Sequence, residues 1–335
     1  MLKYIVKRLA ISILILFGVS VIIYTMVRLM PTDYVDNKYA SQLQSGTIKQ
    51  EDIDRFKDLY GIGDTSFKGI AGGYVKWIGN LMKGDLGLSF KYEKPVGQVI
   101  TENMWISFAI ALVATILQFL IAIPLGISSA THQYSIRDYS VTVFTMIGIS
   151  LPTYFFAAIV IKVFSVDLGW FPSNGLISAT ANYSDDLIGN LQKFGDIVHH
   201  LILPIFVSVL LSIGGLMRYT RTNMLEVLNA DYIRTARAKG LSEKPVIYKH
   251  AFRNTMIPLV TMFAGILPSL FGGMMITEQV FGIDGIGRLA YQALREGDIP
   301  FVMGYNMFLA ILTIIGTLFS DIMYSVVDPR VTLGK

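Results

Sequence analysis

Residues 231–242 read Asp-Tyr-Ile-Arg-Thr-Ala-Arg-Ala-Lys-Gly-Leu-Ser, a short basic stretch between two long apolar runs. Positions 232–239 predict a helix of about two turns, for which Asp231 is a suitable N-cap and Gly240 a suitable C-terminal stop. Isolated helices below roughly 12 residues rarely hold in water, so this helix is expected to rest against a partner. The small residues Ala236, Ala238 and Gly240 would let the backbone of that partner come close.

The wider segment 218–254 is basic. Between positions 218 and 253 there are eight Lys or Arg residues and three Asp or Glu residues. This bias is typical of the cytoplasmic side of a membrane protein. The segment is therefore interpreted as a cytoplasmic coupling loop that docks another protein. The plain alternative is a solvated basic loop whose only role is to fix the orientation of the chain.

Composition places the whole chain in a membrane. Of 335 residues, 53% are apolar and 16% are charged, which is too apolar for an ordinary soluble domain. The net charge of +4 gathers near the expected inner ends of the spans, so it indicates orientation and contact with anionic membrane lipids rather than nucleic-acid binding. The chain has no cysteine, which excludes disulfides and thiolate chemistry.

Six apolar runs reach the roughly 20 residues that a membrane span requires. They predict an all-α polytopic membrane protein with six transmembrane helices at 9–30, 106–130, 139–166, 199–217, 255–277 and 302–327. The first run follows Lys3, Lys7 and Arg8 and lacks a small-residue cleavage site, so it is interpreted as an uncleaved anchor. An even number of spans places both termini in the cytoplasm.

These runs divide the chain into three predicted parts. Residues 1–30 form an N-terminal anchor helix, residues 31–103 an extracytoplasmic loop or cap, and residues 104–330 a core of five transmembrane helices that includes the coupling loop. The cap is large enough to fold and to receive an extracytoplasmic binding protein. A purely structural cover explains its size equally well.

Helix breakers are more frequent than charges inside the predicted spans. The prolines are Pro124, Pro152, Pro204, Pro258 and Pro268, and Gly272 and Gly273 are adjacent. They suggest helices that bend along a moving pathway, although proline and glycine are common in membrane helices. Lys162 and Glu278 lie near predicted outer ends, where their side chains are expected to snorkel to the interface. No acidic residue lies near the middle of a span, which argues against ion-coupled secondary transport.

The sequence shows no set of catalytic residues. His199 and His200 are adjacent, and neighbouring positions on a helix point about 100° apart, so a shared metal ion is not expected. The stretch 79–85 approaches a phosphate-binding loop but has Asp85 where Lys is needed. The chain is therefore expected to be no enzyme, to hold no metal or cofactor of its own, and to lack a P-loop.

Six short motifs resemble those of one family, and they occur along the chain in the order that the family has. They are ARAKGLS at 236–242 with the His, Arg-Asn and Pro at 250, 253–254 and 258; GDLGLS at 84–89; IPLG at 123–126; SLP at 150–152; EQVF at 278–281 with GIG at 285–287; and DPR at 328–330. Together they resemble the permeases of ABC importers in the peptide and nickel branch. The likeness covers almost the whole chain and is greatest to the first membrane subunit of oligopeptide or dipeptide importers.

The resemblance implies a type I importer permease fold and a set of partners. A second six-span permease subunit would complete the pathway, two cytoplasmic ATPase subunits would bind ATP and Mg²⁺, and an extracytoplasmic peptide-binding protein would deliver cargo. The protein would reside in a bacterial or archaeal cytoplasmic membrane. The residues expected to couple to an ATPase groove are Asp231, Arg234, Thr235, Ala236, Arg237, Ala238, Lys239, Gly240, Leu241 and Ser242.

Two departures from the family pattern limit what it implies. Arg234, Thr235 and Ala236 stand where the broad permease motif has Glu-Ala-Ala, so no glutamate-mediated contact is expected. Asp284 precedes Gly285 where the family commonly has proline, which leaves the shape of that outer turn open.

Nickel or another small chelate is the alternative cargo. A stand-alone secondary carrier or membrane enzyme is a remote alternative function. No substrate-binding residue is assigned.

Overall fold

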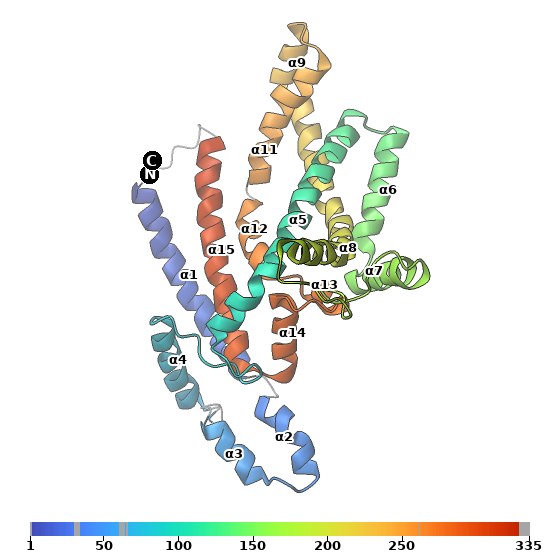
Figure 1. Ribbon diagram of the computed structural model, residues 1–335. Helices are drawn as coiled ribbons and strands as arrows, with labels where there is room; N and C mark the ends of the chain where they lie inside the picture. The colour runs from blue at the N-terminus through green and yellow to red at the C-terminus, as the bar shows by residue number, and fades with distance from the viewer. Residues whose placement is uncertain (1, 30–33, 60–63, 65, 261, 328–335) are drawn as a thin grey trace.

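The structure is a computed structural model that describes residues 2–29, 34–59, 64, 66–260 and 262–327, and every regular element in this part of the chain is a helix (Figure 1). The first half contains α1 (Leu2–Arg28), α2 (Tyr34–Gln44), α3 (Gln50–Leu59), α4 (Phe67–Leu81), α5 (Val96–Thr131), α6 (Ile136–Ser150), α7 (Thr153–Val160) and the π-helical turn η1 (Ile161–Asp167). The second half contains α8 (Leu187–Leu228), α9 (Asp231–Ala238), α10 (Glu243–Pro245), the π-helical turn η2 (Val246–Ala251), α11 (Phe252–Val260), α12 (Phe263–Phe271), α13 (Met275–Val280), α14 (Ile286–Glu296) and α15 (Ile299–Val327).

The all-helical membrane architecture is confirmed, whereas the count of six spans stays a prediction. Among the described residues, α1, α5, α8 and α15 are each long and apolar enough to cross a bilayer. The run 139–166 is split, because α6 meets the α7–η1 segment at a bend of 104° next to Pro152. The run 255–277 falls into the shorter helices α11, α12 and the start of α13, and position 261 lies outside the described residues.

The two longest helices, α5 and α8, pack at very short range. A Cβ atom added to Gly126 of α5 would lie 2.8 Å from the carbonyl oxygen of Met217 on α8. A second close crossing joins α6 and α8. A Cβ added to Gly148 of α6 would lie 3.0 Å from the Leu210 carbonyl oxygen, and one added to Gly214 of α8 would lie 2.7 Å from the Thr145 carbonyl oxygen. Small residues allow such backbone contacts, which are typical of membrane helix packing. The prolines in α5 and α8 do not end these helices.

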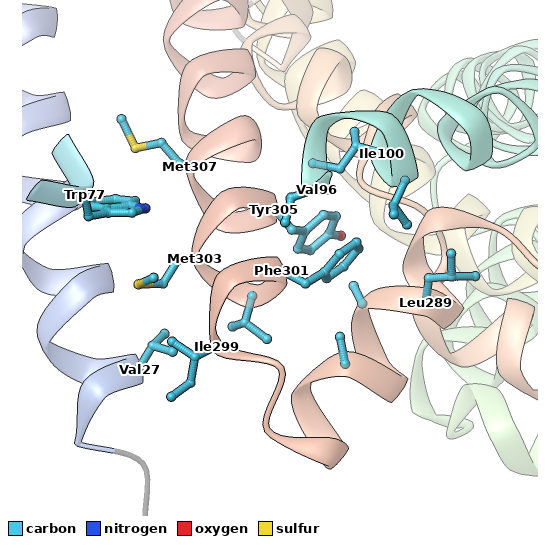
Figure 2. Close-up of a cluster of buried hydrophobic side chains, with 14 of the residues drawn as sticks. Val27, Trp77, Val96, Ile100, Leu289, Ile299, Phe301, Met303, Tyr305 and Met307 are labelled. Carbon is cyan, nitrogen blue, oxygen red and sulfur yellow. The ribbon is translucent and has the colours of Figure 1, made fainter. Parts of the chain in front are cut away.

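The segment between α1 and α5 folds onto one end of the bundle. In Figure 1, α2, α3 and α4 lie at the end opposite α9, while the start of α1 and the end of α15 point toward the α9 side. Figure 2 shows Trp77 of α4 beside Met303 and Met307 of α15, with Val27 of α1 nearby. Val35 and Ile53 are also buried there. Helices α2, α3 and α4 therefore share a hydrophobic cluster with the bundle.

A polar latch fastens the 84–95 segment to the junction of α14 and α15. The buried carboxylate of Asp298 accepts hydrogen bonds from the Ser89 hydroxyl (2.5 Å) and from the amides of Phe90 (3.1 Å) and Lys91 (3.0 Å). The Tyr92 hydroxyl donates to the Leu289 carbonyl at 3.0 Å. Burial and then the charge of Asp298 raise the pKa of Tyr92, so the hydroxyl keeps the proton that it donates. The serine of the GDLGLS motif thus has a structural role.

Glu278 differs from the expectation. Its side chain does not reach toward the interface; it is 1% exposed and accepts hydrogen bonds from the Ser107 hydroxyl (2.7 Å) and the Met274 and Arg288 amides (both 2.9 Å). The snorkelling interpretation is wrong for this residue, because three donors inside the protein bind its carboxylate. Glu278 instead joins α13 to α5 and to the first turn of α14. Lys162 is exposed and pairs with Asp167 at 2.8 Å, as an interfacial lysine should.

Candidate functional site

The basic stretch of the sequence forms the outermost helix at one end of the bundle (Figure 1). Helix α9 follows α8 after a turn at Asn229 and Ala230. Its spacing gives it one apolar face, since Ile233 and Ala236 are three positions apart and both are buried. They pack into a cluster with Ile127 of α5, Met224 of α8 and Val246 of η2. The body of α9 is therefore held against two spans by its own chain.

Gly240 ends α9 in a left-handed conformation with φ of +78°. The Gly240 amide donates to the Arg237 carbonyl at 2.9 Å, and the Leu241 amide donates to the Ala236 carbonyl at 3.4 Å. These two hydrogen bonds form a Schellman motif, which suits glycine because a side chain disfavours positive φ. The predicted stop is confirmed. Within the described part of the chain, nothing except its direct chain neighbours lies within 4 Å of a Cβ added at Gly240, so this side of the turn is open.

The outer face of α9 is exposed and basic. Tyr232, Arg234, Thr235, Ala238 and Lys239 are all exposed. Burial of its inner part raises the pKa of Tyr232, so its hydroxyl stays neutral at physiological pH. The Arg234 guanidinium lies 3.4 Å from Asp231, in an exposed pair that contributes little stability. The face thus offers cations and one aromatic ring to whatever covers it.

A second ion pair shapes the turn that follows α9. The Arg237 guanidinium donates to both Glu243 carboxylate oxygens, from Nε at 3.0 Å and from Nη2 at 3.3 Å. This bidentate geometry fixes the direction of the chain between α9 and α10. The exposed residues Leu241 and Ser242 lie in this turn beside Gly240. The turn and the α9 face form one continuous surface, which we call the α9 surface (residues 231–242).

Beneath the α9 surface, an ion pair between a buried aspartate and a half-buried arginine links α5, α6 and α8. Asp138 of α6 accepts two hydrogen bonds from Arg221 of α8, at 2.8 Å from both Nε and Nη2. The Ser129 hydroxyl of α5 donates to the same carboxylate, and the Tyr134 amide donates to it at 3.0 Å. Removal of one partner from such a pair leaves an uncompensated charge. The pair therefore keeps the three helix ends in a fixed arrangement under α9.

The structure corrects two details of the sequence prediction. Ala230, not Asp231, is the N-cap of α9, and its extended backbone makes no side-chain capping bond. Asp231 begins the helix, where its charge favours the positive end of the helix dipole. Ala236 was expected to leave room for a partner, yet it is buried among this chain's own side chains. The exposed residues Ala238 and Gly240 are the positions at which the backbone of a partner can come close.

Sequence reasoning missed the Ser129, Asp138 and Arg221 node. These residues are 83 or more positions apart in two of their three pairings, so no local spacing joins them. One available signal was an aspartate and an arginine just beyond the expected inner ends of two consecutive predicted spans, 139–166 and 199–217. The adjacent histidines point to different partners, since the Nε2 atom of His199 lies 3.0 Å from the Trp170 carbonyl and the Nδ1 atom of His200 lies 2.9 Å from the Asp196 carbonyl. Among the described residues, no group of three or more His, Cys, Asp or Glu residues could hold a metal ion.

A bundle in which several helices are long and apolar enough to cross a bilayer defines an integral membrane protein. Residues 122–333 match the family of binding-protein-dependent transport system inner membrane components, and the chain belongs to that family. It is 38% identical to the oligopeptide transport system permease protein AppB of Bacillus subtilis, with 99% of each chain covered. It is 32% identical to the dipeptide transport system permease protein DppB of Alkalihalophilus pseudofirmus, again over 99% of each.

A solved structure supports the fold. The MetNI methionine ABC transporter in an inward-facing conformation contains a chain that is 18% identical and superposes with a TM-score of 0.50, covering 69% of this chain and 97% of that one. At this identity the likeness concerns the fold alone. The chain therefore has the fold of an ABC importer permease, and it is a membrane-spanning subunit of that class.

Proposed function

We propose that this chain is the permease subunit that forms half of the translocation pathway of an ATP-driven importer for oligopeptides or dipeptides. The observation that supports the coupling role most directly is the α9 surface. Its apolar side is fixed to α5, α8 and η2, while its basic side is open. A short helix held in this way moves as one body with the spans beneath it. It can transmit a displacement of a bound partner to the pathway.

The partners follow from the family to which the chain belongs and from its permease relatives. Two cytoplasmic ATPase subunits bind ATP and Mg²⁺, and one of them receives the α9 surface in a groove. A second permease subunit completes the pathway. An extracytoplasmic binding protein delivers the peptide to the end that contains α2, α3 and α4. This chain itself catalyses no reaction and holds no cofactor.

The docking role is assigned to ten residues with unequal tasks. Ala236 positions the helix from its buried side, and Gly240 allows the sharp turn at its end. The residues available to touch the ATPase directly are Asp231, Arg234, Thr235, Arg237, Ala238, Lys239, Leu241 and Ser242, all of which are exposed. Charge complementarity then predicts an acidic rim on the ATPase groove.

Orientation is proposed from the same surface. The α9 end faces the cytoplasm, because it contains the basic segment 218–254 and the positive-inside rule places such segments there. Both termini then lie in the cytoplasm and the α2–α4 segment lies outside. We place the protein in a bacterial or archaeal cytoplasmic membrane, in keeping with the bacterial relatives.

Affinity purification tests the assembly. The chain is extracted in mild detergent through a tag after Lys335, and mass spectrometry identifies the proteins that accompany it. We expect a second permease and P-loop ATPases, together with ATPase activity in the eluate. Recovery of an inactive lone chain, under conditions that keep other importers intact, would overturn the assembly.

In proteoliposomes, peptide and Ni²⁺ uptake are then measured in parallel, and uptake of Ni²⁺ without peptide would reassign the cargo.

A further inference from the structure

One face of α8 is polar at the depth where a membrane is most apolar. Ser208 lies nine residues from each end of the apolar run 199–217, which is about 14 Å along a helix on either side. A bilayer core is about 30 Å thick, so Ser208 is near its middle. Ser212 lies one turn further along the same face. Phe206, two residues before Ser208, points to the opposite face.

The polar face of α8 forms the floor of a groove at a place where two predicted spans break. The groove has a volume of about 500 Å³, and its walls are Thr153 of α7 and the segment 274–277 at the start of α13. One break is the 104° bend between α6 and α7. The other is the turn at Gly272 and Gly273, which separates α12 from α13.

The bend in the α6–α7 segment opens this groove. Below the bend, Gly148 and Gly214 bring α6 and α8 together with almost no space between their backbones. Above it, Ala157 of α7 packs against Leu203 and Val207 of α8. Thr153 stands between these two contacts, where the direction of the chain changes. The chain therefore leaves the Ser208 and Ser212 face uncovered at this level.

The second break brings irregular backbone to the same depth. Gly273 has φ of +75°, and the Met274 sulfur lies 3.0 Å from the Ser208 hydroxyl. Backbone that is not helical is tolerated at membrane depth only where it is buried in protein or lines a water-filled cavity. Ile276 is 50% exposed in this groove. The irregular backbone at 272–274 is half-buried and borders the two serines, which indicates a wet surface rather than a lipid-facing one.

The chemistry of the groove is uncharged and suited to a peptide main chain. Its eight lining residues, all described, are Thr153, Ser208, Leu211, Ser212, Met274, Met275, Ile276 and Thr277. The Ser208 hydroxyl donates to the Pro204 carbonyl at 2.8 Å and the Ser212 hydroxyl to the Val209 carbonyl at 3.1 Å. Their oxygen lone pairs remain free to accept from N–H groups. Glu278 does not line this groove, and its carboxylate accepts hydrogen bonds from the Ser107 hydroxyl and the Met274 and Arg288 amides instead.

A second groove on the other side of α8 provides the contrast. It has a volume of about 620 Å³ and is lined only by apolar side chains of α5 and α8, among them Ile202 and Phe206. Lipid chains or apolar helices suit such a surface, because neither needs hydrogen bonds. The two faces of α8 therefore differ at the same depth, and only the serine face offers hydrogen-bonding groups.

We infer that the groove formed by Thr153, Ser208, Ser212 and residues 274–277 is the part of this chain along which the peptide passes. It contacts the main chain of the cargo through hydroxyl oxygens and leaves the cargo side chains without charged partners. This inference rests on the proposed function and assigns residues to its pathway. It implies that the groove tolerates cargo side chains of either charge.

The absence of native cysteine makes a single-cysteine test direct. Ser212→Cys is placed in the groove, and Phe206→Cys serves as the control on the apolar face of the same helix. The complete complex with its ATPases is reconstituted in liposomes. A charged, membrane-impermeant methanethiosulfonate is added during ATP turnover, with and without excess transported peptide. Because thiolate chemistry needs water, we expect Ser212→Cys to react at least about tenfold faster than the control.

Two results support the inference and two overturn it. Faster reaction at Ser212→Cys that excess peptide slows several-fold, with loss of uptake after a bulky reagent is attached, supports it. Equal reaction at both positions would show that lipid or the second permease fills the groove. Fast reaction that peptide does not slow, while uptake continues, would place the peptide elsewhere. Ser208→Cys replaces Ser212→Cys if the latter does not assemble.

The failure of this inference is distinguishable from a failure of the proposed function. Uptake of peptide by the complex with the unsubstituted chain is measured first. If ATP drives no peptide uptake, the proposed function fails before any cysteine is introduced. If uptake is normal and the groove cysteine behaves as the Phe206→Cys control does, only the assignment of the pathway fails.

Discussion

Asp138 is the residue on which the arrangement of the α9 end depends most. Its side chain is 4% exposed and accepts hydrogen bonds from Arg221, Ser129 and the Tyr134 amide. Asp138→Asn leaves the half-buried Arg221 guanidinium without a countercharge, and we expect it to lower the free energy of unfolding by about 1.5–3 kcal/mol. Thermal unfolding of the purified chain in detergent measures this as a lower midpoint temperature.

A matched control keeps the Asp138 prediction specific. Asp231→Asn removes a carboxylate whose side chain is 96% exposed, and such surface changes stay within about 0.5 kcal/mol. The double variant with Asp138→Leu and Arg221→Met should recover most of the loss, because no buried charge is left unpaired. Equal midpoints for Asp138→Asn and Asp231→Asn would contradict the structural role.

Gly240 tests the coupling role at a single residue. At φ of +78° a side chain costs about 1–2 kcal/mol, and valine adds branching at the Cβ atom. No atom of the described residues beyond its chain neighbours lies within 4 Å of the added Cβ atom, so Gly240→Val acts on the turn and on the ATPase groove rather than on the core. We expect the chain to insert normally and ATP-driven uptake to fall to near background.

The control for Gly240 is a residue that accepts the same backbone conformation. Asparagine tolerates the left-handed region, so Gly240→Asn should keep a larger share of uptake than Gly240→Val. Membrane content of each variant is compared by immunoblot. Normal uptake by the Gly240→Val complex would show that this turn is not part of the coupling surface.

At the scale of single residues, local chemistry was predictable and long-range pairing was not. The glycine stop at Gly240 follows from sequence, because the preference for positive φ is intrinsic to glycine. The burial of Glu278 does not, since two of the groups that donate hydrogen bonds to its carboxylate lie on α5 and α14. Ser89 was part of a recognised motif, but its partner Asp298 lies 209 positions away. Only the folded chain brings such residues together.

Among the elements, the segment 84–95 and its latch offer a test of how the cap is fixed. Asp298→Ala removes the acceptor of the Phe90 and Lys91 amides and of the Ser89 hydroxyl. Each buried donor left without a partner costs about 1–3 kcal/mol. We expect faster hydrogen exchange of the amides at 89–91, measured by mass spectrometry, with α8 unchanged.

Asp284→Ala is the control for the latch, because its carboxylate is 75% exposed and pairs only with Arg288 among the interactions of the described residues. Exchange at 89–91 should match that of the unsubstituted chain. If Asp298→Ala left exchange at 89–91 unchanged as well, the hydrophobic cluster around Trp77 alone would hold the segment. If the binding protein stimulates peptide uptake less in the Asp298→Ala complex, the cap acts as a receptor for that protein rather than as a structural cover.

Helix positions were largely predictable, whereas their interruptions were not. Apolar length alone locates α1, α5, α8 and α15, because a span needs about 20 apolar residues. Proline was a poor guide to breaks: Pro124 and Pro204 lie inside continuous helices, whereas the chain bends at Pro152. Whether a proline interrupts a helix depends on what neighbouring helices supply to the freed backbone groups. That information is absent from a local stretch of sequence.

For the whole molecule, two ends with different chemistry are joined by tightly packed spans. One end has the basic α9 surface over the Asp138–Arg221 pair, and the other has the latch and the α2–α4 segment. The all-helical class and the family were predictable because composition and ordered motifs span the chain. The groove at Ser208 and Ser212 was not, because it arises where two broken spans meet. Its position between the two ends is what a transport pathway requires.

The central claim is that this chain converts ATP hydrolysis in partner subunits into peptide movement. The most direct measurement is uptake of a labelled peptide into proteoliposomes that contain the complete complex and its binding protein. The account predicts uptake that requires ATP and is lost in the Gly240→Val complex, while both complexes contain the same subunits. Peptide uptake that continues without ATP, or that the Gly240→Val complex performs at the normal rate, would contradict it.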